Sequence, residues 1–153
     1  AVATVFMPRI AMSVTRRGRL VALVLEAAAV SAVLPTLLLG FLLVLGEHRI
    51  VDLLGPEYQG TWGASVILVV ATLINALTSA TSNVLMFGGR ERLFMVISGA
   101  QLVLVVGGAW LLGTDTAVGM AWWMLIGELL RSCAMVTGFL VHLRGLRPRH
   151  RAD

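Results

Sequence analysis

The chain of 153 residues is too apolar for a soluble domain, because 58% of its residues are hydrophobic, only 13% are charged and the mean hydropathy is +0.91. A soluble fold of this size lacks the polar surface to cover so large an apolar fraction, so the composition indicates that lipid is the solvent. The net charge of +4 comes from arginines placed in short runs between apolar segments, which indicates membrane topology and argues against nucleic-acid binding.

The first predicted element is a short apolar stretch from Ala1 to Met7, which runs into Pro8 and a basic loop. Seven residues cannot cross a bilayer, and position 1 is not an initiator methionine. We expect this stretch to be the cytoplasmic end of a truncated helix, so that the chain is a fragment of a longer protein. The alternative is an interfacial segment of a complete small protein.

Four longer apolar runs follow, and each reaches the length of about 20 residues that crosses the hydrocarbon core of a membrane. The predicted helices cover about 20–46, 62–87, 93–112 and 117–143. We therefore predict an all-α integral membrane bundle of four transmembrane helices, forming one membrane domain over 1–153. Pro35 is expected to kink the first helix. A short interfacial helix ended by Gly55 and Pro56 is expected to follow it.

The connections between these helices alternate in charge. Counting from Arg16, nine arginines lie in the connections before the first helix, between the second and third, and after the fourth, whereas Arg49 alone lies in the other two connections. The positive-inside rule places the arginine-rich connections in the cytoplasm. The C-terminus is therefore predicted to be cytoplasmic, and the chain is predicted to be a multi-pass protein.

Several sequence elements resemble the C-terminal half of bacterial polysaccharide and O-antigen flippases. These belong to the multidrug/oligosaccharidyl-lipid/polysaccharide exporter superfamily. The stretch from Leu53 to Phe94 reads LLGPEYQGTWGASVILVVATLINALTSATSNVLMFGGRERLF. It contains a Gly-x-x-Tyr element at Gly55–Tyr58, an Asn in the middle of the next helix at Asn75, and a Gly-Arg pair at Gly89 and Arg90 followed by the aromatic Phe94.

The flanking segments extend the resemblance over nearly the whole chain. MPRIAMSVTRRGRL is similar to the cytoplasmic loop of the family, in which a proline closes one helix and a polar stretch opens the next. GTDTAVGMAWWMLIGELLR is similar to a Gly-x-x-Gly helix start, with Gly113 and Gly119 at a wider spacing than in the family.

The resemblance implies a function in the bacterial plasma (inner) membrane. Such transporters pair two pseudo-symmetric lobes around a central cavity. The chain would then be most of the C-terminal lobe, with the missing N-terminal lobe of the same protein as a partner. The substrate would be a polyprenyl-pyrophosphate-linked oligosaccharide for cell-surface polysaccharide, and the surrounding partner would be membrane lipid.

Polar residues inside the second predicted helix are the first candidates for a substrate cavity. Asn75, Ser79 and Ser82 are spaced i, i+4 and i+7 and share one stripe, with Thr78 and Asn83 beside it. An amide in hydrocarbon is costly, so this stripe should face protein or a watery cavity. It either lines the cavity and contacts sugar or pyrophosphate, or it joins helices through hydrogen bonds worth about 0.6 kcal/mol each.

Glu128 and Arg131 are the second set of cavity candidates. They lie three residues apart near the middle of the fourth predicted helix, where one lone charge costs about 2.5–3.5 kcal/mol. On one helical face they can form an ion pair that offsets part of this cost. The pair is either structural, or Arg131 binds the anionic pyrophosphate while Glu128 holds it in place.

Two further residues are considered. Glu26, inside the first helix, is a possible ion-coupling residue, or it reaches the cytoplasmic interface. The single Cys133 is interpreted as a buried thiol.

The sequence contains no phosphate-binding loop, nucleophile–base arrangement or metal-ligand spacing, so we predict no enzyme activity, no cofactor and no metal. The functional alternatives are a small membrane scaffold or assembly protein, and a drug exporter of the same superfamily.

Overall fold

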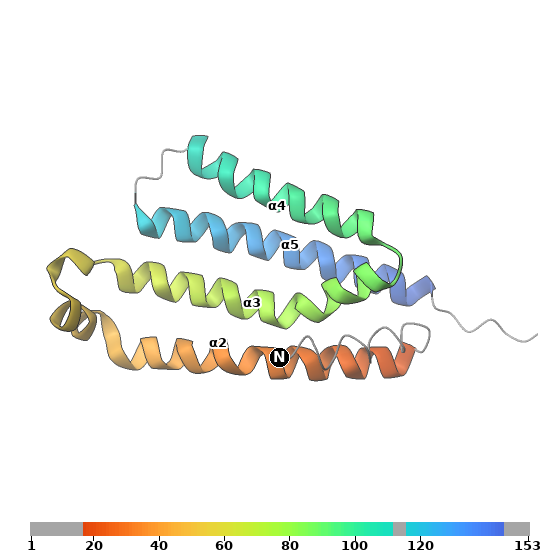
Figure 1. Cartoon of the computed structure of the whole chain (residues 1–153), viewed down its shortest axis with the longest axis horizontal. Coiled ribbons are helices and arrows are strands. Elements are labelled where there is room, and N and C mark those ends of the chain that lie inside the picture. The colour runs from red at the N-terminus through yellow and green to blue at the C-terminus, as the bar shows by residue number, and fades with distance from the viewer. Residues whose placement is uncertain (1–16, 112–115, 146–153) are drawn as a thin grey trace, which may run out of the picture.

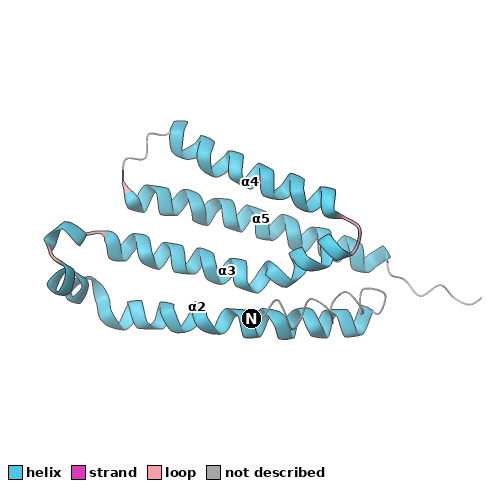
Figure 2. Ribbon diagram, in the orientation of Figure 1, coloured by secondary structure: helices cyan, strands magenta, loops and turns pink. Residues whose placement is uncertain are grey.

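The computed structural model describes residues 17–111 and 116–145, and within these ranges it is an all-α bundle without strands (Figure 2). The four helices are α2 (Arg17–Leu54), α3 (Thr61–Phe87), α4 (Glu91–Leu111) and α5 (Ala117–Gly145), with a short 3₁₀ turn η1 (Pro56–Tyr58) between α2 and α3. Each of the four is long and apolar enough to cross a membrane. The predicted fold class is therefore confirmed, whereas the stretch Ala1–Met7 lies outside the described residues.

Successive helices run in opposite directions, so the chain crosses the bundle four times (Figure 1). The start of α2, the turn between α3 and α4 and the end of α5 lie at one end of the bundle, which we call the basic end. These segments include Arg17, Arg19, Arg90, Arg92 and Arg144. The other end holds the connections that carry Glu47 and Asp52. The charge alternation along the sequence thus becomes a separation between the two ends of the bundle.

The helix α2 breaks at Gly46, the one residue within it that has non-helical backbone angles (φ 67°, ψ 168°). A positive φ suits glycine, which has no side chain to clash. The carbonyl of Leu42, which a regular helix would pair with the Gly46 N–H, accepts a hydrogen bond from the Trp62 indole at 2.9 Å. The first span was predicted to end at position 46; the structure has a break in the helix there, and a helical segment continues to Leu54 as expected. The backbone at Pro35 keeps helical angles.

The turn from α3 to α4 is closed by backbone hydrogen bonds. The Gly88 N–H donates to the Val84 carbonyl at 2.8 Å, and the Arg90 N–H donates to the Leu85 carbonyl at 3.0 Å. Gly89 lies between them with φ 75°. This is the arrangement of a Schellman helix end, in which a left-handed glycine lets the chain reverse. The Gly-Arg pair of the sequence therefore has a structural role in fixing this turn.

One apolar cluster, the basic-end core, joins α2, α3 and α5. Its members are Leu20, Val24, Ala27, Ala80, Val84, Phe139 and Leu143. All are at most 7% exposed, and Leu20 and Val84 are fully buried. Because lipid is as apolar as these side chains, close packing rather than exclusion from water is what holds helices together in a membrane. This cluster is the main place where the described helices interlock.

The helix α4 lies at the edge of the bundle, packed mainly on α5, and it has no buried residue of its own (Figure 1). Its contact with α5 depends on glycines. A Cβ atom at Gly108 would lie 2.7 Å from the Trp123 ring, and one at Gly127 would lie 2.5 Å from Val105 Cγ2. Neither distance is possible for a real Cβ, so only glycine permits this approach. Cys133 lies on the exposed surface of α5, so its interpretation as a buried thiol was wrong.

Candidate functional site

The polar residues of three helices meet at the midpoints of those helices. Arg131 is the fifteenth of 29 residues in α5, Gln101 is the eleventh of 21 in α4, and Asn75 is the fifteenth of 27 in α3. A transmembrane helix places its midpoint near the middle of the hydrocarbon core. The three side chains are therefore gathered where a polar group is most costly.

Arg131 and Glu128 form an ion pair on one face of α5, which confirms that they can pair. Arg131 Nη2 lies 2.5 Å from Glu128 Oε1, and Arg131 Nε donates to Glu128 Oε2 at 3.3 Å. The two side chains are only 11% and 10% exposed. This two-point geometry aligns the planar guanidinium with the carboxylate and is stronger than a single hydrogen bond.

Neighbouring helices complete the bonding of the pair. The Gln101 amide on α4 donates to Glu128 Oε2 at 3.0 Å, and Arg131 Nη2 donates to Asn75 Oδ1 on α3 at 2.6 Å. The Ser132 hydroxyl lies 3.4 Å from Glu128 Oε1 and 2.9 Å from the Thr78 hydroxyl. We call these six residues the midplane network. It links α3, α4 and α5, and it leaves each carboxylate oxygen of Glu128 with two partners.

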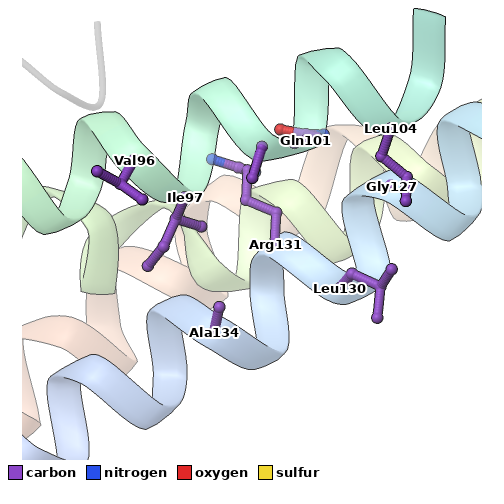
Figure 3. Close-up of a pocket in the computed structure, with 9 residues that line it drawn as sticks. Val96, Ile97, Gln101, Leu104, Gly127, Leu130, Arg131 and Ala134 are labelled. Atoms are coloured by element: carbon purple, nitrogen blue, oxygen red, sulfur yellow. The ribbon is translucent and has the colours of Figure 1, made fainter. Parts of the chain in front are cut away.

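Two grooves open on either side of the Gln101–Glu128 hydrogen bond. The α4–α5 groove, of about 240 Å³, is lined by Val96, Ile97, Ala100, Gln101, Leu104, Gly127, Leu130, Arg131 and Ala134. In Figure 3, Arg131 reaches from α5 toward α4 and ends beside Gln101. The three-helix groove, of about 360 Å³, is lined by Leu68, Ala71, Thr72, Asn75, Gln101, Val105, Met124 and Glu128. The Arg131 side chain therefore lines a groove that is apolar apart from Gln101, while the Glu128 carboxylate lines a more polar groove.

The other predicted site residues lie outside this network. The Ser79 hydroxyl donates to the Ala76 carbonyl at 3.0 Å, and the Ser82 hydroxyl donates to the Thr78 carbonyl at 3.5 Å. Both bonds stay within α3. Of the three residues predicted to share one stripe, only Asn75 therefore belongs to the midplane network. Glu26 is exposed on α2, a helix that packs against α3 on the side away from α4 (Figure 1).

Gln101 and Ser132 are the two network residues that the sequence reasoning missed, and Gln101 is the one that the sequence could have indicated. It stands in the middle of an apolar run, as Asn75 does, and the same argument about the cost of an amide in hydrocarbon applies to it. Ser132 follows Arg131 directly, and no sequence pattern marked it as a site residue. Thr78 was noted only as a neighbour of the stripe, yet it is the α3 hydroxyl that contacts α5.

The chemistry of the site is recognition of charge by hydrogen-bond donors. A guanidinium offers five N–H donors in a fixed plane, which suits the oxygens of a carboxylate or a phosphate. Within the described residues, no three His, Cys, Asp or Glu side chains lie close enough together to hold a metal ion. The arrangement can bind an anion at Arg131, provided that Glu128 gives way.

Comparisons of the chain with models of known protein families, with curated proteins and with solved structures find no match.

Proposed function

We propose that the chain is part of a membrane flippase that moves polyprenyl-pyrophosphate-linked oligosaccharide across a bacterial plasma membrane for cell-surface polysaccharide biosynthesis. The observation that carries the proposal is Arg131, which lies at the midpoint of α5 and lines an apolar groove. A lipid-linked pyrophosphate must pass the middle of the membrane when it crosses from one leaflet to the other. A cation at that depth would lower the barrier to the passage of its anionic head group.

The cost of the midplane network supports a functional role. A lone arginine or acidic residue at a helix centre costs about 2.5–3.5 kcal/mol, and intramembrane ionisable residues are usually found on substrate or ion pathways. A helix bundle held only by packing needs neither Glu128 nor Arg131. The resemblance of Leu53–Phe94 to polysaccharide flippases supports the same function independently of the side-chain geometry. The proposal requires a second lobe to enclose the path.

The direct test replaces Arg131 and measures surface polysaccharide in the bacterium that makes the protein. Arg131→Ala should abolish, or reduce at least about tenfold, the amount of exported polysaccharide, equivalent to the loss of about 1.4 kcal/mol or more of interaction with the head group. The protein level in the membrane is measured alongside, and export is compared per amount of protein, because loss of the guanidinium also leaves Glu128 unpaired. Arg92→Ala is the matched control, because it removes an exposed arginine from the first turn of α4. Export that stays intact with Arg131→Ala at normal protein level would overturn the proposal.

The same variants separate the alternative functions. A drug exporter of this superfamily would show altered resistance to cationic compounds with normal polysaccharide, although a guanidinium facing the groove disfavours cations by like-charge repulsion. A scaffold or assembly protein would tolerate both Arg131→Ala and Asn75→Ala. Loss of polysaccharide only in the midplane variants would favour transport over both.

A further inference from the structure

The ion pair and the bond to Asn75 occupy the edge of the Arg131 guanidinium that is formed by Nε and Nη2. Nε and Nη2 face the carboxylate of Glu128, and Nη2 also donates to Asn75. Glu128 in turn receives hydrogen bonds from Gln101 on Oε2 and from Ser132 on Oε1. The carboxylate thus occupies the position and the donors that a phosphate oxygen would need. An anion can form a two-point bond with this edge of Arg131 only if it displaces Glu128.

We propose that Glu128 is an internal counter-ion which the anionic head group displaces from Arg131, and that Glu128 takes up one proton when it is displaced. This inference rests on the proposed function and specifies how the same site is regulated. In the exchange, the two Arg131–Glu128 hydrogen bonds break and two Arg131–phosphate hydrogen bonds form. The proton comes from the aqueous solution and stays on the carboxyl group until the anion leaves, when it returns to the solution.

The charge balance of the network favours uptake of the proton. With Glu128 ionised, the pair is neutral and offsets none of the negative charges of a pyrophosphate; with Glu128 protonated, Arg131 offsets one of them. α3 carries no charged residue between Thr61 and Phe87, and the charges of α4, Glu91 and Arg92, lie in its first turn. The groups that face Glu128 from these helices are the neutral Gln101 and, through Arg131 and Ser132, Asn75 and Thr78. Protonation is therefore the available way to remove one negative charge.

The surroundings of Glu128 also suit its protonated form. The Ser132 hydroxyl can accept as well as donate a hydrogen bond, so it can partner the acid proton. Gln101 can keep its bond to the other oxygen, because a protonated carboxyl group still accepts on its carbonyl oxygen. A role for Glu128 as a counter-ion predicts the opposite result from a role in holding Arg131 in place. Removing the charge should strengthen anion binding in the first case and weaken it in the second.

The experiment uses the full chain purified in a neutral detergent, with farnesyl pyrophosphate as the probe. The dissociation constant is measured between about pH 5 and pH 8 for the wild type, Glu128→Gln and Arg131→Gln. Wild-type affinity should rise as the pH falls, by up to about tenfold per pH unit, because one proton is bound with the anion. Glu128→Gln should bind at least about tenfold more tightly at neutral pH. Its remaining pH dependence should be that of the probe alone.

Further probes distinguish a lipid from a free anion. Inorganic pyrophosphate and farnesol, tested separately, should each bind at least about tenfold more weakly than farnesyl pyrophosphate if the groove takes an amphiphile. Equal binding of inorganic pyrophosphate would assign the exchange to a free anion and would overturn the link to a lipid-linked substrate. Proton uptake by the wild type on addition of the probe, corrected with Arg131→Gln, tests the exchange even if Glu128→Gln does not fold.

The outcomes separate this inference from the proposed function. Binding by Arg131→Gln as tight as that of the wild type would remove the basis of both. Loss of binding in Arg131→Gln, together with weaker binding or an unchanged pH slope in Glu128→Gln, would leave the proposed function standing and overturn the exchange. An absence of proton uptake by the wild type would overturn it as well.

Discussion

The basic-end core and the midplane network hold the same helix, α5, by different physics. The core joins α5 to α2 and α3 through side chains that are at most 7% exposed and carry no polar atom. The network joins α5 to α3 and α4 through an ion pair and the amides of Asn75 and Gln101. The first region needs only complementary shape. The second brings two charges and two amides into hydrocarbon, where apolar residues of similar size would pack at lower cost.

This difference indicates which region is specialised for stability and which for function. Buried ion pairs replaced together by apolar residues often leave a protein equally stable or more stable, whereas loss of one partner is strongly destabilising. The packing of glycines against Trp123 and Val105 already holds α4 on α5 without any charge. The comparison therefore predicts that the network can be removed as a unit at little cost in stability, while the core cannot.

The largest effect is expected when the ion pair is broken from one side. Arg131→Leu leaves the Glu128 carboxylate without its guanidinium and should lower the free energy of unfolding by about 3–5 kcal/mol. The double variant Glu128→Leu/Arg131→Leu should recover to within about 1 kcal/mol of the wild type, since no charge is left uncompensated. Thermal unfolding of the purified protein in detergent measures both. A double variant as unstable as the single one would show that the bundle needs the ion pair for its stability. It would contradict the distinction between a core for stability and a network for function.

An intermediate effect is expected in the basic-end core. Phe139→Ala should lower the free energy of unfolding by about 2 kcal/mol. This is the cost of a cavity of roughly 100 Å³ at about 24 cal/mol per Å³. The contribution from transfer out of water is left out, because the surrounding lipid is itself apolar. Phe41→Ala is the matched control, because Phe41 is 61% exposed on α2 whereas Phe139 is 7% exposed. The control should leave the melting temperature nearly unchanged. Equal losses for the two variants would show that the cluster is not where the bundle interlocks.

The helices were predictable from the sequence because a membrane span is a long apolar run whose length follows from the thickness of the bilayer. The predicted bounds of the second and fourth helices lie within two residues of those of α3 and α5, whereas α2 continues to Leu54 beyond a break at Gly46, where the first span was predicted to end. The pairing of Glu128 with Arg131 followed from their spacing of three residues on a helix. These features depend on local sequence, and local sequence was enough to predict them.

The partners on other helices were not predictable in the same way. Which face of α3 meets α5 depends on the rotation of one helix about its axis relative to the next, and a polar stripe does not determine that rotation. Asn75 and Thr78 therefore contact α5, while Ser79 and Ser82 bond within their own helix. Gln101 has a role only because Gly127 and Gly108 bring α4 close to α5, and a glycine in a sequence does not indicate which helix it approaches.

The smallest of the three effects tests whether this close approach supports the network. Gly127→Ala places a Cβ atom 2.5 Å from Val105 Cγ2, and a β-branched side chain in a helix has little freedom to turn away. Overpacking of this kind costs about 1–3 kcal/mol, and the better helix propensity of alanine returns about 1 kcal/mol. We therefore expect a net loss of about 1 kcal/mol by thermal unfolding. α4 should also move away from α5, which lengthens the Gln101–Glu128 hydrogen bond.

Two further variants make the explanation specific. Gly99→Ala is the control on α4, because a Cβ atom there meets nothing within 4 Å and only the gain in helix propensity should remain. Val105→Ala combined with Gly127→Ala removes the clashing methyl groups and should restore the stability lost in the single variant. A double variant that remains as unstable as Gly127→Ala would mean that the glycine acts through its own helix rather than through α4. Recovery would instead show that the contact of Gly127 with Val105 fixes the distance between α4 and α5 beside Glu128. The apolar packing of the bundle would then determine the geometry of the midplane network.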